Sequence, residues 1–357
     1  MNNLSLTVLL SIKGRPNFTK RWLDYMALIK FEHNIVIADG DADGYTKQLL
    51  NDSSYEKLKI NFFEYKQTIK YIDYYKMVLT AIERSDSKYV MFCDNDDFLL
   101  PSGLDKILSF LEINPDHISR GGYITGFKVN GGIPTDFGSS FNLSFYYERL
   151  FRLEEPSSNW YSFVEEVLFD FQSSFYNVHT KESIYTIYNE IVEMNFTDLT
   201  VTERYYQLRL PSLGKVSYDH SAFHYLRQKG TSNSANWNVP LEILKSDMPS
   251  DIRKLAKKIS SIIDEEDSKF EAHILNKYAD YYGYYFSHTT LKYRFTKLFN
   301  YKLAFMNSSI GKGLKKCLNL YENYQLLSKV KKWSNGSIYK SFDDEIKAIS
   351  NFITKAR

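Results

Sequence analysis

The segment Tyr89-Val-Met-Phe-Cys-Asp-Asn-Asp-Asp97 is an apolar run that ends abruptly in three carboxylates. Such a run is typical of a buried strand, and the acids mark the turn after it. In open α/β sheets, ligands bind beyond the carboxyl ends of the strands. Asp94 and Asp96 can therefore hold one hard cation, since Mg²⁺ and Mn²⁺ prefer oxygen ligands and share them with substrate phosphates. The alternative is an acidic turn that only caps the next helix.

The residues before this turn alternate short apolar runs with helical patterns, as in a parallel sheet with crossover helices. The expected strands are Leu4–Ser11, Ile35–Asp39, Leu58–Phe63 and Tyr89–Cys93. The expected helices are Phe18–Ile29, Tyr45–Leu50 and Ile69–Arg84. This order predicts a nucleotide-binding half of Rossmann-like type.

Beyond the acidic turn, we expect a helix over Ser102–Asn114, with Ser102 as its N-cap and Pro115 marking its end. Residues 130–180 have weak periodicity and are expected to form loops. The remaining expected elements are helices near 182–193 and 199–210 and strands at Tyr123–Val129, Val216–Tyr218 and Ala222–Arg227. The fold class is therefore α/β, with a mixed sheet flanked by helices and a mainly helical C-terminal region.

Two further polar loops follow predicted strands. Asp39-Gly-Asp41-Ala-Asp43-Gly44 begins like a calcium loop, but its twelfth position is Leu50 rather than the required Glu. Its carboxylates can accept hydrogen bonds from a nucleotide base or ribose, or the segment is a plain turn. Ser11-Ile-Lys13-Gly14-Arg15-Pro16 places two cations before a helix, where they can hold a nucleotide, although Lys13 is equally compatible with a solvated loop.

Together these segments resemble the family 2 type GT-A glycosyltransferases. The resemblance rests on the first strand followed by Arg15-Pro16 and a helix, on the Asp39 strand end, and on FCDNDDFLLPSGLDKIL at residues 92–108. It implies a GT-A domain in which Asp94-Asn95-Asp96 binds a divalent metal, Mn²⁺ or Mg²⁺, and the diphosphate of a nucleotide-sugar donor. The segment Tyr225-Leu-Arg227 resembles the closing part of such domains, where Arg227 or His224 approaches the diphosphate.

A second part of the resemblance concerns catalysis. Thr202-Glu203-Arg-Tyr-Tyr-Gln-Leu-Arg209 is similar to the family's acid–x₅–Arg-Leu segment, and this implies that Glu203 is the catalytic base. The family usually has Glu-Asp where this chain has Thr202-Glu203, so Asp198 is the alternative base. The residues Gln207-Leu-Arg209 differ from the Gln-x-x-Arg-Trp of processive synthases, which favours transfer of a single sugar.

The candidate residues fall into three groups. The candidate bases are Glu203 and Asp198. The candidate donor-nucleotide contacts are Ser11, Lys13, Arg15, Asp39, Asp41, Asp94, Asn95 and Arg227. The candidate metal ligands are Asp94, Asp96 and His224, although a lone His on an alternating strand is also compatible with a hydrogen-bonded structural role.

The expected domains are a catalytic, nucleotide-sugar-binding domain at 1–228, a linker at 229–240 and a basic, aromatic helical domain at 241–357. Residues 291–340 contain 11 Lys and Arg against one acid, Glu322. This segment is expected either to contact an anionic membrane or to pack on the catalytic domain with its lysines solvated.

The composition limits the partners and the cellular location that we expect for this protein. A formal net charge of +2 over 357 residues argues against nucleic-acid binding, which needs clustered basic charge. The two cysteines, Cys93 and Cys317, are far apart, so no disulfide framework is indicated and a reducing compartment fits. The sequence shows no signal-peptide pattern and no apolar run long enough to span a membrane. We expect a cytoplasmic protein, either free or peripheral at the inner face of the membrane.

The expected function is metal-dependent, inverting transfer of one sugar from a nucleotide-sugar donor to a hydroxyl of a glycan or lipid-linked acceptor. The Lys-, Asn-, Ile- and Tyr-rich composition suggests bacterial surface polysaccharide synthesis. Two alternatives stay open: a sugar nucleotidyltransferase with a similar acidic metal site, and a non-catalytic carbohydrate-binding or membrane scaffold protein. Nucleophile-elbow, Walker, dinucleotide-binding and zinc-protease motifs are absent from the sequence.

Overall fold

The computed structural model describes residues 6–41, 43–65, 70–129, 136–144, 159–169, 174–229, 247–263, 268–281 and 342–355. The expected linker at 229–240 lies outside these residues except for Lys229, and the basic segment 291–340 lies outside them entirely.

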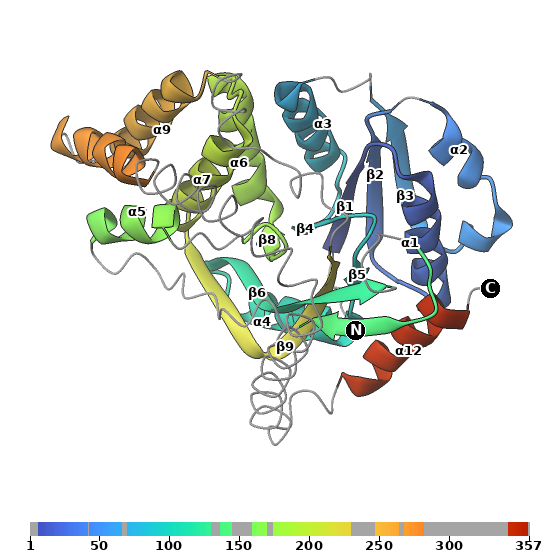
Figure 1. Ribbon diagram of the computed structural model, residues 1–357. Coiled ribbons are helices and arrows are strands. Elements are labelled where there is room, and N and C mark those ends of the chain that lie inside the picture. Colours follow the sequence, from blue (N-terminus) through green and yellow to red (C-terminus); the bar gives the residue numbers. More distant parts are fainter. Residues whose placement is uncertain are drawn as a thin grey trace, which may run out of the picture.

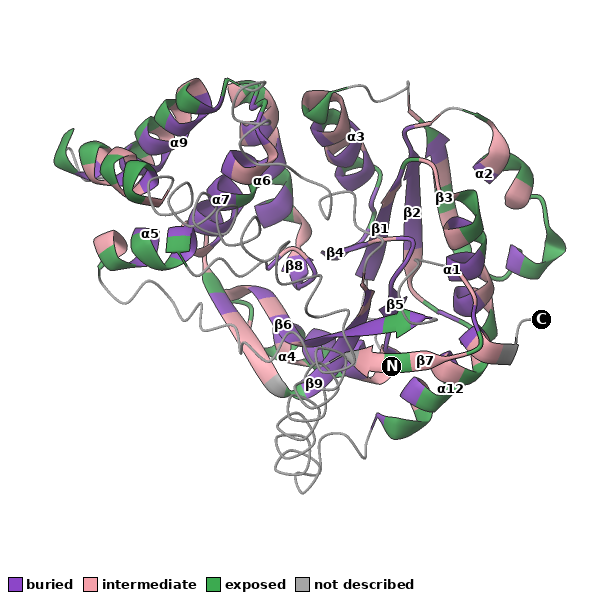
Figure 2. Cartoon of the chain, in the orientation of Figure 1, coloured by how far each residue is buried: buried purple, intermediate pink, exposed green. Residues whose placement is uncertain are grey.

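Four parallel strands form one half of a single sheet (Figure 1). Their order is β3 (Lys59–Glu64), β2 (Asn34–Asp39), β1 (Leu6–Ile12) and β4 (Tyr89–Cys93). The order 3-2-1-4 and the parallel pairing confirm the predicted Rossmann-like half. β1, β2 and β4 are almost wholly buried, as expected of parallel strands covered on both faces (Figure 2).

The second half of the sheet is mixed. It continues from β4 through β8 (Val178–Thr180), β6 (His117–Val129), β9 (Lys215–Gln228) and β5 (Phe98–Leu99), and β7 (Phe141–Ser144) pairs with β6. β8 is antiparallel to both neighbours, whereas β9 is parallel to β6. This confirms the predicted α/β class with a mixed sheet.

The mixed half differs from the expectation in detail. The two short strands expected at 216–218 and 222–227 are parts of one strand, β9, whose pairing with β6 shifts register near Gly122 and Tyr123. β7 and β8 lie within the region 130–180 that was expected to form loops. Both strands are short, three or four residues, so they leave little periodicity in the sequence.

The helices cover both faces of the sheet. Their bounds are α1 Pro16–Leu28, α2 Tyr45–Leu49, α3 Tyr71–Glu83, α4 Pro101–Ile113, α5 Trp160–Phe169, α6 Lys181–Met194, α7 Leu199–Arg209, α9 Met248–Ile262 and α12 Asp343–Lys355, with short 3₁₀ turns at Ser53–Tyr55 and Leu210–Ser212. The prediction of Ser102 as the N-cap of α4 is wrong. The helix begins one residue earlier, at Pro101, because proline suits the first helical position.

Alternate residues of β1, β2 and β4 enter two different cores. In β1, Val8 and Leu10 belong to the first core, which α1, α4 and α12 cover. Leu9 belongs to the second core, which α3, α5, α6, α7 and α9 cover. Cys93 lies in the first core as a buried free thiol, with its sulfur 3.3 Å from the indole nitrogen of Trp22.

The described helices of the C-terminal region pack on both cores. α9 and the helical residues 268–281 contribute to the second core beside α7, while α12 contributes to the first. Within the described residues, none of the helices has the length and apolar character needed to cross a membrane.

Candidate functional site

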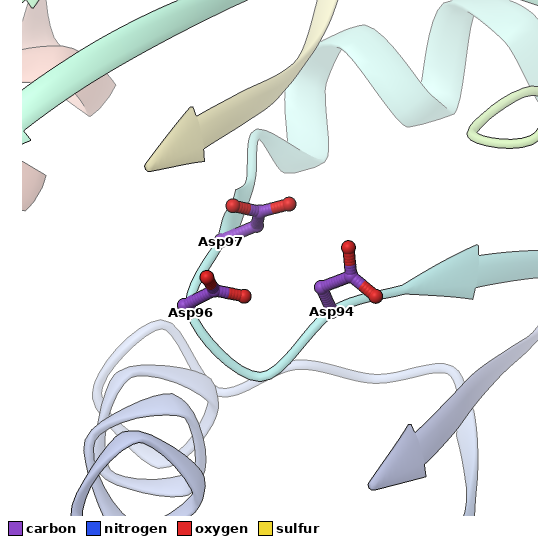
Figure 3. A group of neighbouring side chains, drawn as sticks. All are labelled: Asp94, Asp96 and Asp97. Carbon is purple, nitrogen blue, oxygen red and sulfur yellow. The ribbon is translucent and has the colours of Figure 1, made fainter. Parts of the chain in front are cut away.

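The acidic turn 94–97 follows β4 directly. The amide of Asp97 donates to the carbonyl of Asp94 across 3.3 Å, so the chain reverses tightly. Asp94, Asp96 and Asp97 each place a carboxylate oxygen within 4.8 Å of the others (Figure 3). In the described part of the chain, this is the one group of three such side chains close enough to share a metal ion.

Asp97 ties the turn to β9. Its carboxylate accepts a hydrogen bond from the Tyr225 hydroxyl at 2.7 Å and another from the Gln228 amide at 2.7 Å. Burial raises the pKa of Asp97 well above its ordinary value, and the charges of Asp96 and Asp94 raise it further. Asp97 is thus a structural anchor that joins the turn to β9.

Asp94 is the most solvent-accessible of the three acids. Tyr176 donates its hydroxyl to Asp94 Oδ2 at 2.7 Å, and the ring of Tyr176 stacks on Tyr225 with centroids 4.4 Å apart. Burial raises the pKa of Asp94, as does the charge of Asp96, whereas Arg227 and Arg15 lower it. The two arginines therefore favour the charged form of Asp94.

Two arginines of the α1 region hold Asp96. Arg15 Nη1 lies 2.9 Å from Asp96 Oδ2. Arg21 donates through Nη2 to the Asp96 carbonyl at 2.6 Å and through Nη1 to the side chain of Gln228 at 2.7 Å. Burial lowers the pKa of Arg21 to about 10, although the neighbouring carboxylates Asp96 and Asp97 favour its charge. Arg21 is therefore a buried cation that fixes the turn.

Asn95 is turned inward. Its side-chain amide donates to the Thr19 hydroxyl at 2.9 Å, and the residue is buried. The structure therefore gives this predicted donor contact a role in joining the turn to α1.

The ends of β1 and β2 lie beside the acidic turn. Leu10 pairs with Cys93 and Ile12 with Asp39, so Ser11, Asp39 and Asp94 share one edge of the sheet. Asp39 is buried and accepts the amide of Asp41 at 3.0 Å. Burial raises its pKa, while the Thr46 hydroxyl and the Asp41 amide lower it.

The loop after β1 adopts left-handed backbone. Gly14 has φ 67° and Arg15 has φ 57°, a region that residues with a Cβ rarely adopt. A Cβ on Gly14 would lie 3.6 Å from Asp41 Oδ2, so the loops after β1 and β2 meet here. Lys13 is exposed at the same edge.

Glu203 stands out on α7. Glu203 is exposed, whereas all the remaining residues from Val201 to Leu210 are buried. Burial nevertheless raises its pKa, Arg204 and Arg227 lower it, and Asp198 raises it. A side chain that contacts solvent but is still desolvated has protein around it on several sides, as in a binding site.

Two side chains, Tyr74 and Arg227, lie near both Asp94 and Glu203. Burial raises the pKa of the Tyr74 phenol on α3, and the charges of Asp94 and Glu203 raise it further. The charge of Arg227 acts on both carboxylates as well. Tyr74 and Arg227 therefore lie within electrostatic reach of the acidic turn and of the α7 acid, which are more than 100 positions apart in the chain.

Asp198 has a different role from Glu203. It is buried at the N-cap of α7, where its carboxylate accepts the amide of Val201 at 3.0 Å. The carboxylate of Asp198 is thus turned toward the backbone of its own helix, whereas Glu203 is exposed.

His224 does not join the carboxylate group. Its Nε2 donates to the carbonyl of Tyr176 at 3.0 Å, and burial lowers its pKa to about 4. Neighbouring residues of a strand face opposite sides, and Tyr225 faces the acidic turn, so His224 faces away from it. The structure therefore supports the structural interpretation of His224 rather than the metal-ligand one.

The sequence did not single out Arg21, Tyr74 and Tyr176. Arg21 could have been found, because a cation on the apolar face of a predicted amphipathic helix indicates a buried and paired side chain. Tyr176 carried no such signal, since it lies 82 positions from Asp94 in a segment of weak periodicity.

No family model matches this sequence, and no curated protein matches it in sequence. Among solved structures, the chain is similar to TarS from S. aureus. TarS 1-349 has 14% identity and a TM-score of 0.46, over 76% of this chain and 71% of that one. TarS 1-349 in complex with UDP has 16% identity and a TM-score of 0.48, over 79% and 72%. The complex with UDP-GlcNAc has 14% identity and a TM-score of 0.43, over 78% and 80%. At these identities no residue role carries over from TarS.

Proposed function

We propose that this chain is a metal-dependent, inverting glycosyltransferase that moves one sugar from a nucleotide-sugar donor to a hydroxyl of a glycan or lipid-linked acceptor. One observation carries the proposal. Glu203 is the exposed acid of an otherwise buried stretch of α7, and it shares Tyr74 and Arg227 with the acidic turn after β4. A base and a phosphate-binding turn at one site are what transfer to a hydroxyl requires.

The acidic turn fits a divalent cation. Three carboxylates lie within 4.8 Å of one another, and their mutual repulsion raises the pKa values of Asp94 and Asp97 beyond the effect of burial. Asp94 and Asp96 would hold Mn²⁺ or Mg²⁺, because these ions prefer carboxylate oxygens. A bound metal supplies positive charge to the diphosphate leaving group.

The proposal assigns donor contacts to one edge of the sheet. Asp39 and Asp41 at the end of β2 accept hydrogen bonds from the nucleoside, and Ser11 and Lys13 lie beside it. Arg15 and Arg227 provide cations for the phosphates. The loops after β1, β2 and β4 meet at this edge, and this supports the assignments.

In the proposed reaction, Glu203 takes the proton of the acceptor hydroxyl as that oxygen attacks the anomeric carbon of the donor. The bond from this carbon to the phosphate oxygen breaks, and its electron pair leaves with the nucleotide. A single displacement inverts the anomeric configuration. The raised pKa of Glu203 suits a base, because a more basic carboxylate accepts the proton more readily.

The setting is part of the proposal too. We place the reaction at the cytoplasmic face of a bacterial membrane, in surface polysaccharide synthesis, with residues 291–340 as the membrane contact. Liposome sedimentation tests this contact with a full-length variant whose Lys and Arg in 291–340 are replaced by Gln. Replacement suits the chain better than truncation, because α9 and α12 belong to the two cores. Binding to anionic vesicles as strong as that of the wild type would refute the contact.

The experiment that tests the activity is product analysis. The full chain is incubated with Mn²⁺ and a panel of UDP-GlcNAc, UDP-glucose, UDP-galactose and GDP-mannose, and release of nucleoside diphosphate is followed. The proposal predicts release with at least one donor, and loss of release after chelation by EDTA. Pyrophosphate from a nucleoside triphosphate and a sugar phosphate would indicate a nucleotidyltransferase instead. Binding of glycan without nucleotide or Mn²⁺ would indicate a scaffold protein.

A further inference from the structure

Asp251, near the start of α9, is a fully buried carboxylate outside the site described above. Its Oδ2 accepts the amide of Thr197 at 2.7 Å, the hydroxyl of Thr197 at 2.8 Å and the amide of Asp198 at 2.9 Å. Its Oδ1 accepts Lys254 Nζ at 3.1 Å. One buried acid thus binds the backbone immediately before α7, and hydrogen bonds to a charged group are stronger than neutral ones.

These contacts complete the cap of α7. Asp198 already satisfies the amide of Val201 through its own carboxylate. Asp251 satisfies the amides of the two residues before the first helical residue, so the position where α7 begins is fixed from outside the helix. Glu203 follows about one turn later on this helix.

The other end of α7 is tied to α9 as well. Arg209 Nε lies 2.8 Å from Glu190 Oε2, and Lys258 Nζ of α9 lies 3.2 Å from Glu190 Oε1. Between the two ties, apolar residues of α7 and α9 share the second core. α9 therefore holds the start of α7 directly and its end through Glu190 of α6.

We infer that Asp251 is a positioning residue: by fixing the start of α7, it holds Glu203 opposite the acidic turn. This inference rests on the proposed function. It also gives α9, a helix of the C-terminal region, a part in turnover although it supplies no side chain to the site. Misplacing a catalytic group by about 1 Å costs as much as a hundredfold in rate, so a shift of the α7 start is enough to matter.

The test compares two full-length variants with the same chemical change. Asp251→Asn loses the buried charge at the start of α7. Asp219→Asn is the control. Like Asp251, Asp219 accepts a backbone amide, that of Ser221 at 2.7 Å, and pairs with a cation, Arg120, at 3.2 Å. It lies toward the other end of β9 from Arg227.

Hydrogen exchange measures the positioning directly. We expect amides of residues 197–203 to exchange on the order of tenfold faster in Asp251→Asn and at the wild-type rate in Asp219→Asn. Exchange at the wild-type rate in Asp251→Asn overturns the inference whether or not any donor is turned over.

Kinetics with the fastest donor of the panel measure the consequence. We expect Asp251→Asn to lower kcat by on the order of tenfold while KM for the donor changes less than about twofold, because the donor contacts lie on other elements. In a Glu203→Gln background, Asp251→Asn is expected to cause no further fall in kcat, since both changes act through the carboxylate of Glu203.

Two outcomes separate the inference from the proposed function. The positioning role alone is overturned if Asp251→Asn leaves kcat unchanged. It is also overturned if Asp251→Asn lowers kcat by the same factor in the Glu203→Gln background as in the wild type. Full turnover by Glu203→Gln overturns the proposed function instead.

Discussion

The guanidinium of Arg15 lies 2.9 Å from the buried carboxylate of Asp96. Arg15 reaches it from a left-handed backbone position, φ 57°, directly before α1. A residue with a Cβ adopts this conformation at a cost, and surrounding structure must hold it there. The proposed metal ligand Asp96 is thus already paired with a cation of the protein, so a metal ion and Arg15 compete for it.

The first prediction follows from that competition. The substitution Arg15→Asn removes the guanidinium, and asparagine tolerates the left-handed backbone at this position. We expect Mn²⁺ affinity without nucleotide to rise roughly tenfold, because a charge-assisted hydrogen bond no longer has to be broken. Affinity for the nucleoside diphosphate of the donor is expected to fall, since a phosphate contact is lost. Titration calorimetry measures both, with Lys20→Asn as the control on the exposed side of α1. Mn²⁺ affinity equal to or below that of the wild type contradicts the competition.

The second prediction concerns pH. Only the deprotonated form of Glu203 can accept a proton, so kcat falls as the pH drops through its pKa, which burial raises above the ordinary value of 4.5. The charge of Arg227 lowers this pKa. Arg227→Gln is therefore expected to shift the acid limb of the kcat profile to higher pH, whatever its effect on the maximum. An acid limb that stays in place, or moves to lower pH, would show that Glu203 does not set it.

The third prediction concerns acid stability. Burial lowers the pKa of His179 to about 3 and that of His224 to about 4. Both rings are neutral when folded and bind protons when unfolded, so the stability they contribute is complete above about pH 6.5 and is lost as the pH falls toward 4. Each contributes a slope of at most about 1.4 kcal/mol per pH unit.

His179→Gln tests this, since the ring is buried with its Nε2 3.0 Å from the Tyr206 hydroxyl. We expect denaturant unfolding between pH 6.5 and 4 to show a shallower loss of stability in the variant than in the wild type. An equally steep loss would mean that His179 is protonated in the folded protein.

The fourth prediction concerns the C-terminal helix. Glu345 on α12 accepts the amide of Ser102 at 3.1 Å and its hydroxyl at 2.6 Å, and so caps α4 just after the acidic turn. Glu345→Ala is expected to lower the free energy of unfolding by about 1 kcal/mol, the usual cost of a lost cap. Asp344→Ala, at an exposed position on the same helix, is the control. Equal stability of the two variants would contradict the capping role.

Local patterns predicted the parallel half of the sheet well. β4 and the acidic turn are adjacent in sequence, and their change from apolar to acidic residues needs no distant partner to be recognised. The same holds for Asp39 at the end of β2. The position of Glu203 followed from a resemblance, and its exposure on an otherwise buried stretch of α7 could not be predicted from periodicity, because α7 has little amphipathic pattern.

Contacts between distant segments could not be predicted. Arg21 reaches the carbonyl of Asp96 from 75 positions away, and Ser102 meets Glu345 from 243 positions away. His224 and Arg227 were equal candidates for a diphosphate contact in the sequence, yet in β9 their side chains point to opposite sides of the strand. A strand sets which side each residue faces only once its partner strand and register are known.

The most direct measurement is the release of nucleoside diphosphate by Glu203→Gln protein saturated with its donor and Mn²⁺. Glutamine keeps the shape of the side chain but cannot accept the proton, and Glu182→Gln on the exposed start of α6 serves as the matched control. We expect turnover to fall by about a hundredfold or more while the nucleoside diphosphate of that donor still binds with wild-type affinity. Turnover equal to that of the control would show that the acid of α7 and the acidic turn of β4 do not act on the same bound donor.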